Sequence, residues 1–343
     1  MTIHAMPTGA PPINLIIDTA CGLGYWPEES LVIALYAVRR DGAAERVLAM
    51  RCNLSDIKSA DTEGDATGWR DYVASVVSRT DADFADVLLI DPAQSEHWQA
   101  VTVATEAMML ADVDIRDIVV ALSHADHLAW TRLDGQSPLV LDEHPWQTMP
   151  WSDAEALAGG ARDWRLSRGD LVAEIRSHDN ADLRGVIDLA DEAARDDAIV
   201  AAGTYLCSEA ATGGAAAESG DAARFADEQV LGALADVRIR DTVIWDLLQR
   251  PSQQWSEAAN RLVPLVQRAA PGHVAPVATI LGLLRWQLGD GTRASIALDR
   301  ALADNPDYTL GRLIDGCLQA GIAPTMWREG LGSLSREQCR RPG

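Results

Sequence analysis

Lysine and phenylalanine are almost absent from this chain of 343 residues. Lys58 is the only lysine beside 28 arginines, and two phenylalanines stand against eleven tryptophans. Cysteine is sparse as well, and its five residues form no C-x-x-C pair and no Cys-His spacing of the zinc-binding kind. They are Cys21, Cys52, Cys207, Cys317 and Cys339. We therefore expect free thiols that behave as small apolar residues in a reducing compartment.

Signals for export, membrane insertion and common catalytic chemistry are missing too. No basic-then-apolar run opens the chain, and no apolar stretch approaches the roughly 18–20 residues that a membrane helix needs. No Walker A loop, G-x-S-x-G elbow or H-E-x-x-H motif occurs. Gly22-Leu23-Gly24 begins like a dinucleotide-binding loop, but Pro27 stands where the third glycine belongs. The sequence predicts a cytoplasmic protein with no cofactor, no metal and no recognisable catalytic residue.

Negative charge is concentrated in the N-terminal part of the chain. Residues 1–200 carry 35 acidic and 15 basic residues, a net charge of −20, whereas residues 251–343 carry 8 and 10, a net charge of +2. An acidic surface repels phosphate backbones and anionic lipids, so nucleic-acid and membrane binding are not expected. Arg336, Arg340 and Arg341 form a basic tail, for which a solvated chain end is the simpler interpretation.

Apolar strands and amphipathic helices alternate in the first part of the sequence. The predicted strands are 30–38, 46–54, 86–91, 117–123 and 127–133, and the predicted helices are 69–79 and 97–112. The first two strands are joined by a polar turn that contains Asp41-Gly42, which is typical of a β-hairpin. This alternation favours a mixed sheet with helices packed on it, over about residues 12–145.

Beyond Ser152 the pattern becomes helical. The predicted helices are 152–160, 165–176, 180–206, 224–235, 240–249, 253–269, 274–288, 291–303 and 309–319. Small residues fill 208–223, which is interpreted as a flexible linker. We therefore predict an α/β (α+β) N-terminal domain with a mixed sheet and trailing helices over 12–207. An all-helical, tetratricopeptide-like C-terminal domain is predicted over 224–330.

The tetratricopeptide likeness depends on residues 278–308. The residues at the offsets of such a helical hairpin are Leu281, Gly282, Gly289, Ala294, Leu298, Ala301 and Pro306. Small side chains at three of these positions allow two antiparallel helices to touch, while the leucines fill the seam between them. We predict an antiparallel helix pair over 278–304 that is broken at Gly289-Asp290-Gly291, because glycine is unfavourable inside a helix.

Three segments carry a family resemblance: GYWPEESLV from Gly24 to Val32, RCNL at 51–54, and the series from Pro271 to Leu302. They resemble the actinobacterial family called domain of unknown function 4192, and the resemblance extends from about Leu15 to Trp327. It implies a bacterial, intracellular protein and brings no established activity with it. Asn53 stands where this family commonly has an aspartate, which weakens the idea that a carboxylate is needed there.

Arg51 and Ser30 are candidate ligand-binding residues near the first predicted hairpin. Arg51 could clamp an anionic ligand through two parallel hydrogen bonds, with the Ser30 hydroxyl as a further donor. The alternative is an ordinary ion pair between Arg51 and a neighbouring glutamate, Glu28 or Glu29. We favour this second interpretation.

A second group of polar residues surrounds His124 and His127, with His144 further along the chain. Imidazoles beside a carboxylate are suitable ligands for zinc or iron. In an extended strand, however, the side-chain alternation would direct His124 and His127 to opposite faces, so no metal held by these three histidines is expected. Trp130 belongs to a cluster with Trp146, Trp151 and Trp164 that could line a ligand groove or a protein interface; packing between the sheet and the first helices is favoured.

Together these patterns favour a non-enzymatic protein-interaction or scaffolding protein whose protein partner the sequence does not identify. The alternative is a small-ligand sensor or an enzyme that uses the N-terminal domain. Its candidate residues are Ser30, Arg51, His124, His127 and Trp130. A ligand-sized pocket bearing two or more of these side chains would favour the alternative, and an elongated concave helical surface would favour the first.

Overall fold

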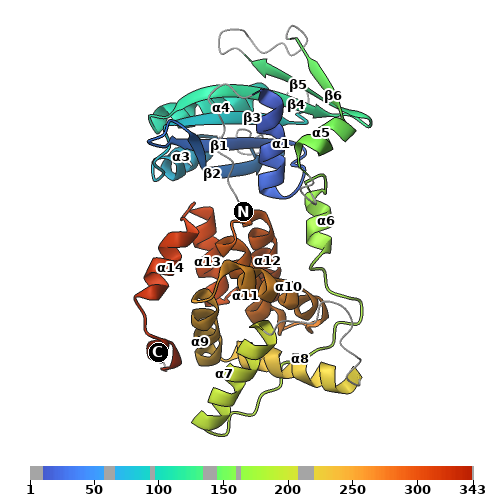
Figure 1. Ribbon diagram of the computed structural model, residues 1–343, viewed down its shortest axis with the longest axis vertical. Helices are drawn as coiled ribbons and strands as arrows, with labels where there is room; N and C mark the ends of the chain where they lie inside the picture. Colours follow the sequence, from blue (N-terminus) through green and yellow to red (C-terminus); the bar gives the residue numbers. More distant parts are fainter. Residues whose placement is uncertain are drawn as a thin grey trace. The chain divides into compact units, whose positions relative to one another are not determined.

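A six-stranded mixed sheet is the centre of the first of two units into which the chain divides (Figure 1). Unit 1 comprises Met1–Arg168 and unit 2 comprises Gly169–Gly343. The computed structural model describes residues 11–57, 66–92, 97–133, 145–159, 164–207 and 220–341. Unit 2 is helical, so the chain combines an α+β part with a helical C-terminal part, as the sequence predicts.

The strands follow the order β2-β1-β3-β4-β5-β6 across the sheet. They are β1 (Ser30–Val38), β2 (Ala44–Asn53), β3 (Phe84–Ile90), β4 (Asp114–Ser123), β5 (His127–Leu133) and β6 (Gln147–Pro150). Only β3 and β4 run parallel among these pairs; the other neighbours are antiparallel. The predicted β1–β2 hairpin is confirmed, and Gly42 adopts the positive φ of 81° at its turn, where a residue without Cβ is unstrained.

Helices cover both faces of the sheet (Figure 1). The helices of unit 1 are α1 (Pro12–Leu23), α3 (Ala66–Val77), α4 (His97–Leu110) and α5 (Trp151–Leu157). Successive residues of a strand point to opposite faces, so Leu88 packs with α1 and α5 while Leu89 packs with α3 and α4. Both leucines are completely buried. The near-continuous apolar run of β3 is explained by this two-sided burial.

Several stretches differ from the sequence prediction, which included neither β6 nor the last two helices at 324–332 and 336–340. Helix α1 was not predicted, and Gly24 ends it in the left-handed conformation with φ 74°, so this glycine follows a helix before β1 begins. The helix predicted over 180–206 begins only at Glu192. Residues before it cross a neighbouring helix at close range, since a Cβ on Gly185 would lie 2.7 Å from the backbone nitrogen of Gly232. Gly185 allows this approach because it has no Cβ.

Unit 2 is a series of helices, and the connections between successive helices from Gly220 to Arg340 are short (Figure 1). The helices from Arg168 onward are α6 (Arg168–Ala173), α7 (Glu192–Cys207), α8 (Gly220–Ala235), α9 (Val237–Leu248), α10 (Ser252–Arg268), α11 (Val274–Gln287), α12 (Gly291–Asp304), α13 (Thr309–Gln319), α14 (Pro324–Gly332) and α15 (Arg336–Arg340). Most of the predicted linker lies outside the described residues, at 208–219, and α8 begins at Gly220. The division at residues 168 and 169 differs from the predicted domain boundary because α7 packs on α8, α9 and α10.

The helix break predicted between 278 and 304 is confirmed. Helix α11 ends at Gln287, Gly289 adopts φ 80°, and α12 begins at Gly291 with Asp290 accepting a hydrogen bond from the Arg293 amide at 3.0 Å. Gly282 lets the two helices approach, because a Cβ there would lie 2.9 Å from Leu298 Cγ. The two helices are antiparallel and pack on each other more extensively than on any other helix.

We expect Ala294→Trp to lower the free energy of unfolding of unit 2 by more than about 1 kcal/mol, because overpacking a tight core typically costs about 1–3 kcal/mol. Ala294 is completely buried, and its carbonyl oxygen lies 3.2 Å from the Cβ position of Gly282. Urea unfolding measures the change. The matched control is Ala303→Trp on the exposed side of α12. Equal losses in both variants would contradict the assignment of the buried face.

Candidate functional site

Polar side chains gather at the sheet edge where the parallel strands β3 and β4 end. Ile90 pairs with Ala121 on one side and with Ser30 on the other, so the ends of β3 and β4 and the start of β1 lie together. Two residues without a glycine's freedom adopt a positive φ here, Glu29 at 45° and Asp91 at 49°. Such strained conformations are found preferentially at functional sites, which makes this edge the first candidate.

Asp91 connects three segments at this edge. Its carboxylate accepts hydrogen bonds from the Ser123 amide at 2.5 Å, from the Ser123 hydroxyl at 2.7 Å and from Trp26 Nε1 at 2.9 Å. Its own amide donates to the Ala121 carbonyl at 2.8 Å. These bonds tie the end of β3 to β4 and to the segment after α1. The carboxylate is therefore occupied as a structural acceptor.

Arg51 and Ser30, which the sequence suggests as joint ligand-binding residues, are in contact in the structure. Arg51 Nε donates to Ser30 Oγ at 2.8 Å, and the buried Ser30 hydroxyl donates to the Glu28 carbonyl at 2.7 Å. Arg51 makes no further hydrogen bond within the described part of the chain. Burial raises the pKa of the nearby Tyr25 hydroxyl, and the positive charges of Arg51 and Arg168 oppose that rise. The group presents cationic donors suited to an anion.

His124 and His127 lie on the same side of the turn between β4 and β5, which corrects the expectation that they are splayed apart. Their rings stack with centroids 4.5 Å apart, because the His124 amide donates to the His127 carbonyl at 2.9 Å and closes the turn. His127 Nδ1 pairs with the exposed Asp126 carboxylate at 2.7 Å. His144 lies outside the described residues. Over the described ranges, no three His, Cys, Asp or Glu residues are placed to hold a metal together.

Trp130 lies in the core and not on a ligand groove. It is 4% exposed and packs on the α1 side of the sheet, and its Nε1 has no hydrogen-bond partner among the described residues. The same core holds Trp26, Trp151 and Trp164, whose rings contact one another at centroid distances of 5.4–6.2 Å. The prediction that the clustered tryptophans pack between the sheet and the first helices is confirmed for Trp130, Trp151 and Trp164.

The cysteines are poor candidates for nucleophiles. Burial raises the pKa of Cys52, beside Arg51, to about 12. Burial likewise raises the pKa of each of the other four thiols, which are those of Cys21, Cys207, Cys317 and Cys339. A thiol attacks only as a thiolate, so these side chains are largely unreactive at neutral pH.

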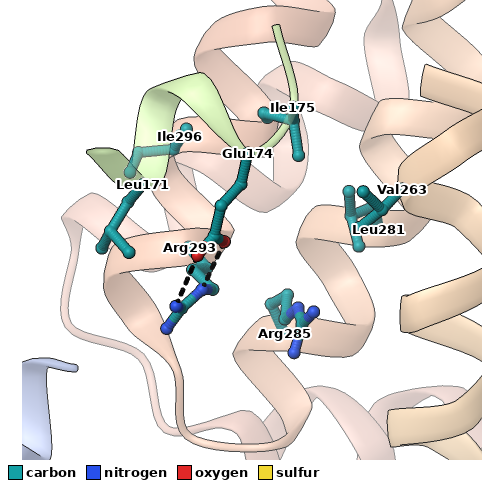
Figure 2. Close-up of a pocket in the computed structure, with 8 residues that line it drawn as sticks. All are labelled: Leu171, Glu174, Ile175, Val263, Leu281, Arg285, Arg293 and Ile296. Carbon is teal, nitrogen blue, oxygen red and sulfur yellow. Dashed lines mark hydrogen bonds and ion pairs between the residues drawn. The ribbon is translucent and has the colours of Figure 1, made fainter. Parts of the chain in front are cut away.

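A small hollow lies in unit 2 between α6, α10, α11 and α12 (Figure 2). Its lining residues are Leu171, Glu174, Ile175, Val263, Leu281, Arg285, Arg293 and Ile296. Glu174 accepts two hydrogen bonds from Arg293, each 2.9 Å long. Burial lowers the pKa of Arg285, whose guanidinium donates to Asn260 at 3.0 Å. The hollow measures about 10 Å³, which accommodates one water molecule at most and no organic substrate.

Asp91 and Trp26 are not among the site residues predicted from the sequence. The available signal was the position of Asp91, an acidic residue directly after a buried apolar strand and before Pro92. Its three hydrogen bonds come from residues 32 and 65 positions away in the chain. Contacts at such separations are not visible in local sequence patterns.

A family model described as "Domain of unknown function (DUF4192)" matches residues 21–325. The chain belongs to this family. The matched range includes the sheet edge around Arg51 and Asp91 as well as the α11–α12 hairpin of the DUF4192 chain. No curated protein and no solved structure matches the sequence. Within the described segments, no helix is both long enough and apolar enough to cross a membrane.

We expect Asp91→Ala to destabilise unit 1 by about 1–3 kcal/mol, because it leaves donors at Ser123 and Trp26 without their acceptor. Urea unfolding followed by tryptophan fluorescence reports the loss. Asp126→Ala is the matched control at the same sheet edge, since that carboxylate is 87% exposed. A variant at Asp91 as stable as the control would show that the three hydrogen bonds do not hold the edge together.

Proposed function

We propose that this DUF4192 protein is a non-enzymatic protein-interaction protein and that unit 2 carries the interaction. The observation behind the proposal is the order of packing in unit 2. Helix α10 packs on α11, α11 on α12, and α12 on α13, so successive helices stack on their sequence neighbours. Stacked helical hairpins of this kind form extended surfaces that are suited to binding other proteins.

A tetratricopeptide-like character is part of the proposal. It is supported by the small residues where α11 meets α12, Gly282 and Ala294, and by the short connection between the helices. Solenoids need about three repeats for stability. The flanking helices α10 and α13 would extend the stack in the two directions along the chain.

The small hollow in unit 2 and the sheet edge around Asp91 both favour a non-enzymatic protein over an enzyme. The hollow in unit 2 has the volume of a water molecule, and its charged groups Arg293 and Glu174 satisfy each other. At the sheet edge, the three protein hydrogen bonds that the Asp91 carboxylate accepts, one of them from the Ser123 hydroxyl, give it a structural role.

A second candidate function is the binding of a small anionic ligand at Arg51. The specific observation in its favour is the single hydrogen bond of the guanidinium, through Nε to Ser30, within the described part of the chain. Two terminal nitrogens of an arginine match a carboxylate or phosphate group bidentately. His124 and His127 lie after β4, and the strands β1 and β3 separate them from Arg51 on β2, so they are not part of this candidate site.

We expect the full chain, purified from its native host, to retain a protein partner in a fixed ratio. Leu313→Glu should weaken the association, because Leu313 is 52% exposed on α13 and a charge there opposes apolar contact. Mass spectrometry identifies co-purifying proteins and small molecules together. The matched control is Val38→Glu on unit 1, where Val38 is 48% exposed.

The opposite outcome is equally specific. A chain that purifies without a protein but with a small anion, and loses that anion in an Arg51→Ala variant, would replace the first function by the second. Retention of the same protein at the same ratio in the Leu313→Glu and wild-type chains would contradict the role of α13.

A further inference from the structure

The last two helices extend away from the stack and return to an earlier part of unit 2. Neither α14 nor α15 contains a buried residue. Helix α15 nevertheless packs on α9, far back in the sequence (Figure 1). An isolated helix of five residues is unstable in water, so its contacts must hold it.

Those contacts are made mainly by two arginines. Arg336 donates to both carboxylate oxygens of Asp246 on α9, at 2.7 and 2.8 Å. Arg340 pairs with Asp196 on α7 and, at 3.2 Å, with Glu192 on the same helix. The tail that was interpreted as a solvated end is therefore docked by Arg336 and Arg340. We call Glu192, Asp196 and Asp246 the acidic face.

The docked segment is a short capped helix that carries two arginines. Ser335 and Gln338 form a capping box, with the Gln338 amide donating to Ser335 Oγ at 3.2 Å and the Ser335 amide to Gln338 Oε1 at 2.7 Å. Arg336 and Arg340 are four residues apart, which places both on one side of a helix. Trp245 Nε1 donates to the Leu334 carbonyl at 3.0 Å. The two arginines are therefore the groups that the acidic face binds, and Trp245 holds the carbonyl of Leu334 beside it.

The attachment is accessible to water. The side chains of Arg336 and Asp246 are 41% and 30% exposed, and that of Asp196 is 49% exposed. Ion pairs with this exposure contribute little stability and are screened by salt. Glu192 also pairs with Arg195 at 2.7 Å and lies 3.9 Å from Arg238, so it is shared among several arginines. A competing cation can take each of these positions.

Helix α14 has an anchor of its own. Trp327 contacts Trp286 with ring centroids 6.0 Å apart, and the Arg328 guanidinium lies 5.4 Å from the centre of the Trp255 ring. These contacts are aromatic and not ionic. The residues from Ser333 onward can therefore leave the acidic face while α14 stays on α10 and α11.

We propose that the acidic face binds a short, capped, arginine-bearing helix of a protein partner, and that residues 334–341 occupy it as a displaceable internal ligand. The proposal rests on unit 2 being the interacting unit and names the chemistry of one partner segment. That segment carries two arginines four residues apart, which meet carboxylates on α7 and α9. A partner binds only when it displaces the chain's own α15.

The test uses a fluorescein-labelled peptide of residues 324–341, with Cys339→Ser, and the full chain at low ionic strength. Fluorescence anisotropy measures the affinity of the peptide for the wild type, for the double variant Arg336→Glu/Arg340→Glu and for Arg341→Glu. The last variant is the control, because Arg341 has no ion pair in the described part of the chain. In the wild type, α15 occupies the acidic face for about nine-tenths of the time, whereas in the double variant the face is free. We therefore expect the double variant to bind the peptide about tenfold more tightly than the wild type. The control should match the wild type.

Adding Asp246→Arg to the double variant should abolish peptide binding. Equal affinity of the wild type and the double variant, or binding that survives Asp246→Arg, would overturn the proposal; so would a double variant that binds no peptide. Because the probe is the chain's own segment, these outcomes do not depend on which partner exists. A failed co-purification would count against the proposed function and leave this result unaffected.

Discussion

The close contact between α11 and α12 is the constraint on which unit 2 depends. Twelve of the fourteen residues of α11 are buried, so this helix must find partners on nearly every side. Gly282 lets α12 approach on one side, and Asp304 at the end of α12 accepts hydrogen bonds from the amides of Val274 and Ala275, both at 3.0 Å. A carboxylate at a helix start satisfies amides that have no partner within the helix. Helices α8, α10, α13 and α14 pack on this pair.

In unit 1, one parallel pair of strands has antiparallel strands on both sides. Where β3 and β4 end, Asp91 joins them by accepting hydrogen bonds from Ser123 and Trp26, in a backbone conformation that aspartate adopts at some cost. Arg51 and Ser30 lie at the same edge and are less fully engaged. The side chains at this edge therefore serve mainly to join the strands, and the Arg51 guanidinium there can still bind an anion.

Elements defined by local chemistry were predictable from the sequence, and elements defined by distant contacts were not. Asp41-Gly42 specifies the first hairpin, and the glycines around Asp290 specify the break between α11 and α12, because both depend on a few adjacent residues. The stacking of His124 on His127 depends on how a turn closes, which alternation along a strand does not describe. Likewise, Arg336 meets Asp246 from 90 residues away, a contact that no local pattern contains.

Charge holds the C-terminal helix on the acidic face, whereas packing holds the core of unit 2. Hydrogen exchange of the full chain, measured by mass spectrometry at low salt and in about 1 M sodium chloride, separates these two kinds of attachment because salt screens exposed ion pairs. We expect the amides of α15 to exchange faster at high salt while the exchange of those of α11 is unchanged. Protection of α15 that does not respond to salt, or that is lost together with α11, would contradict this expectation.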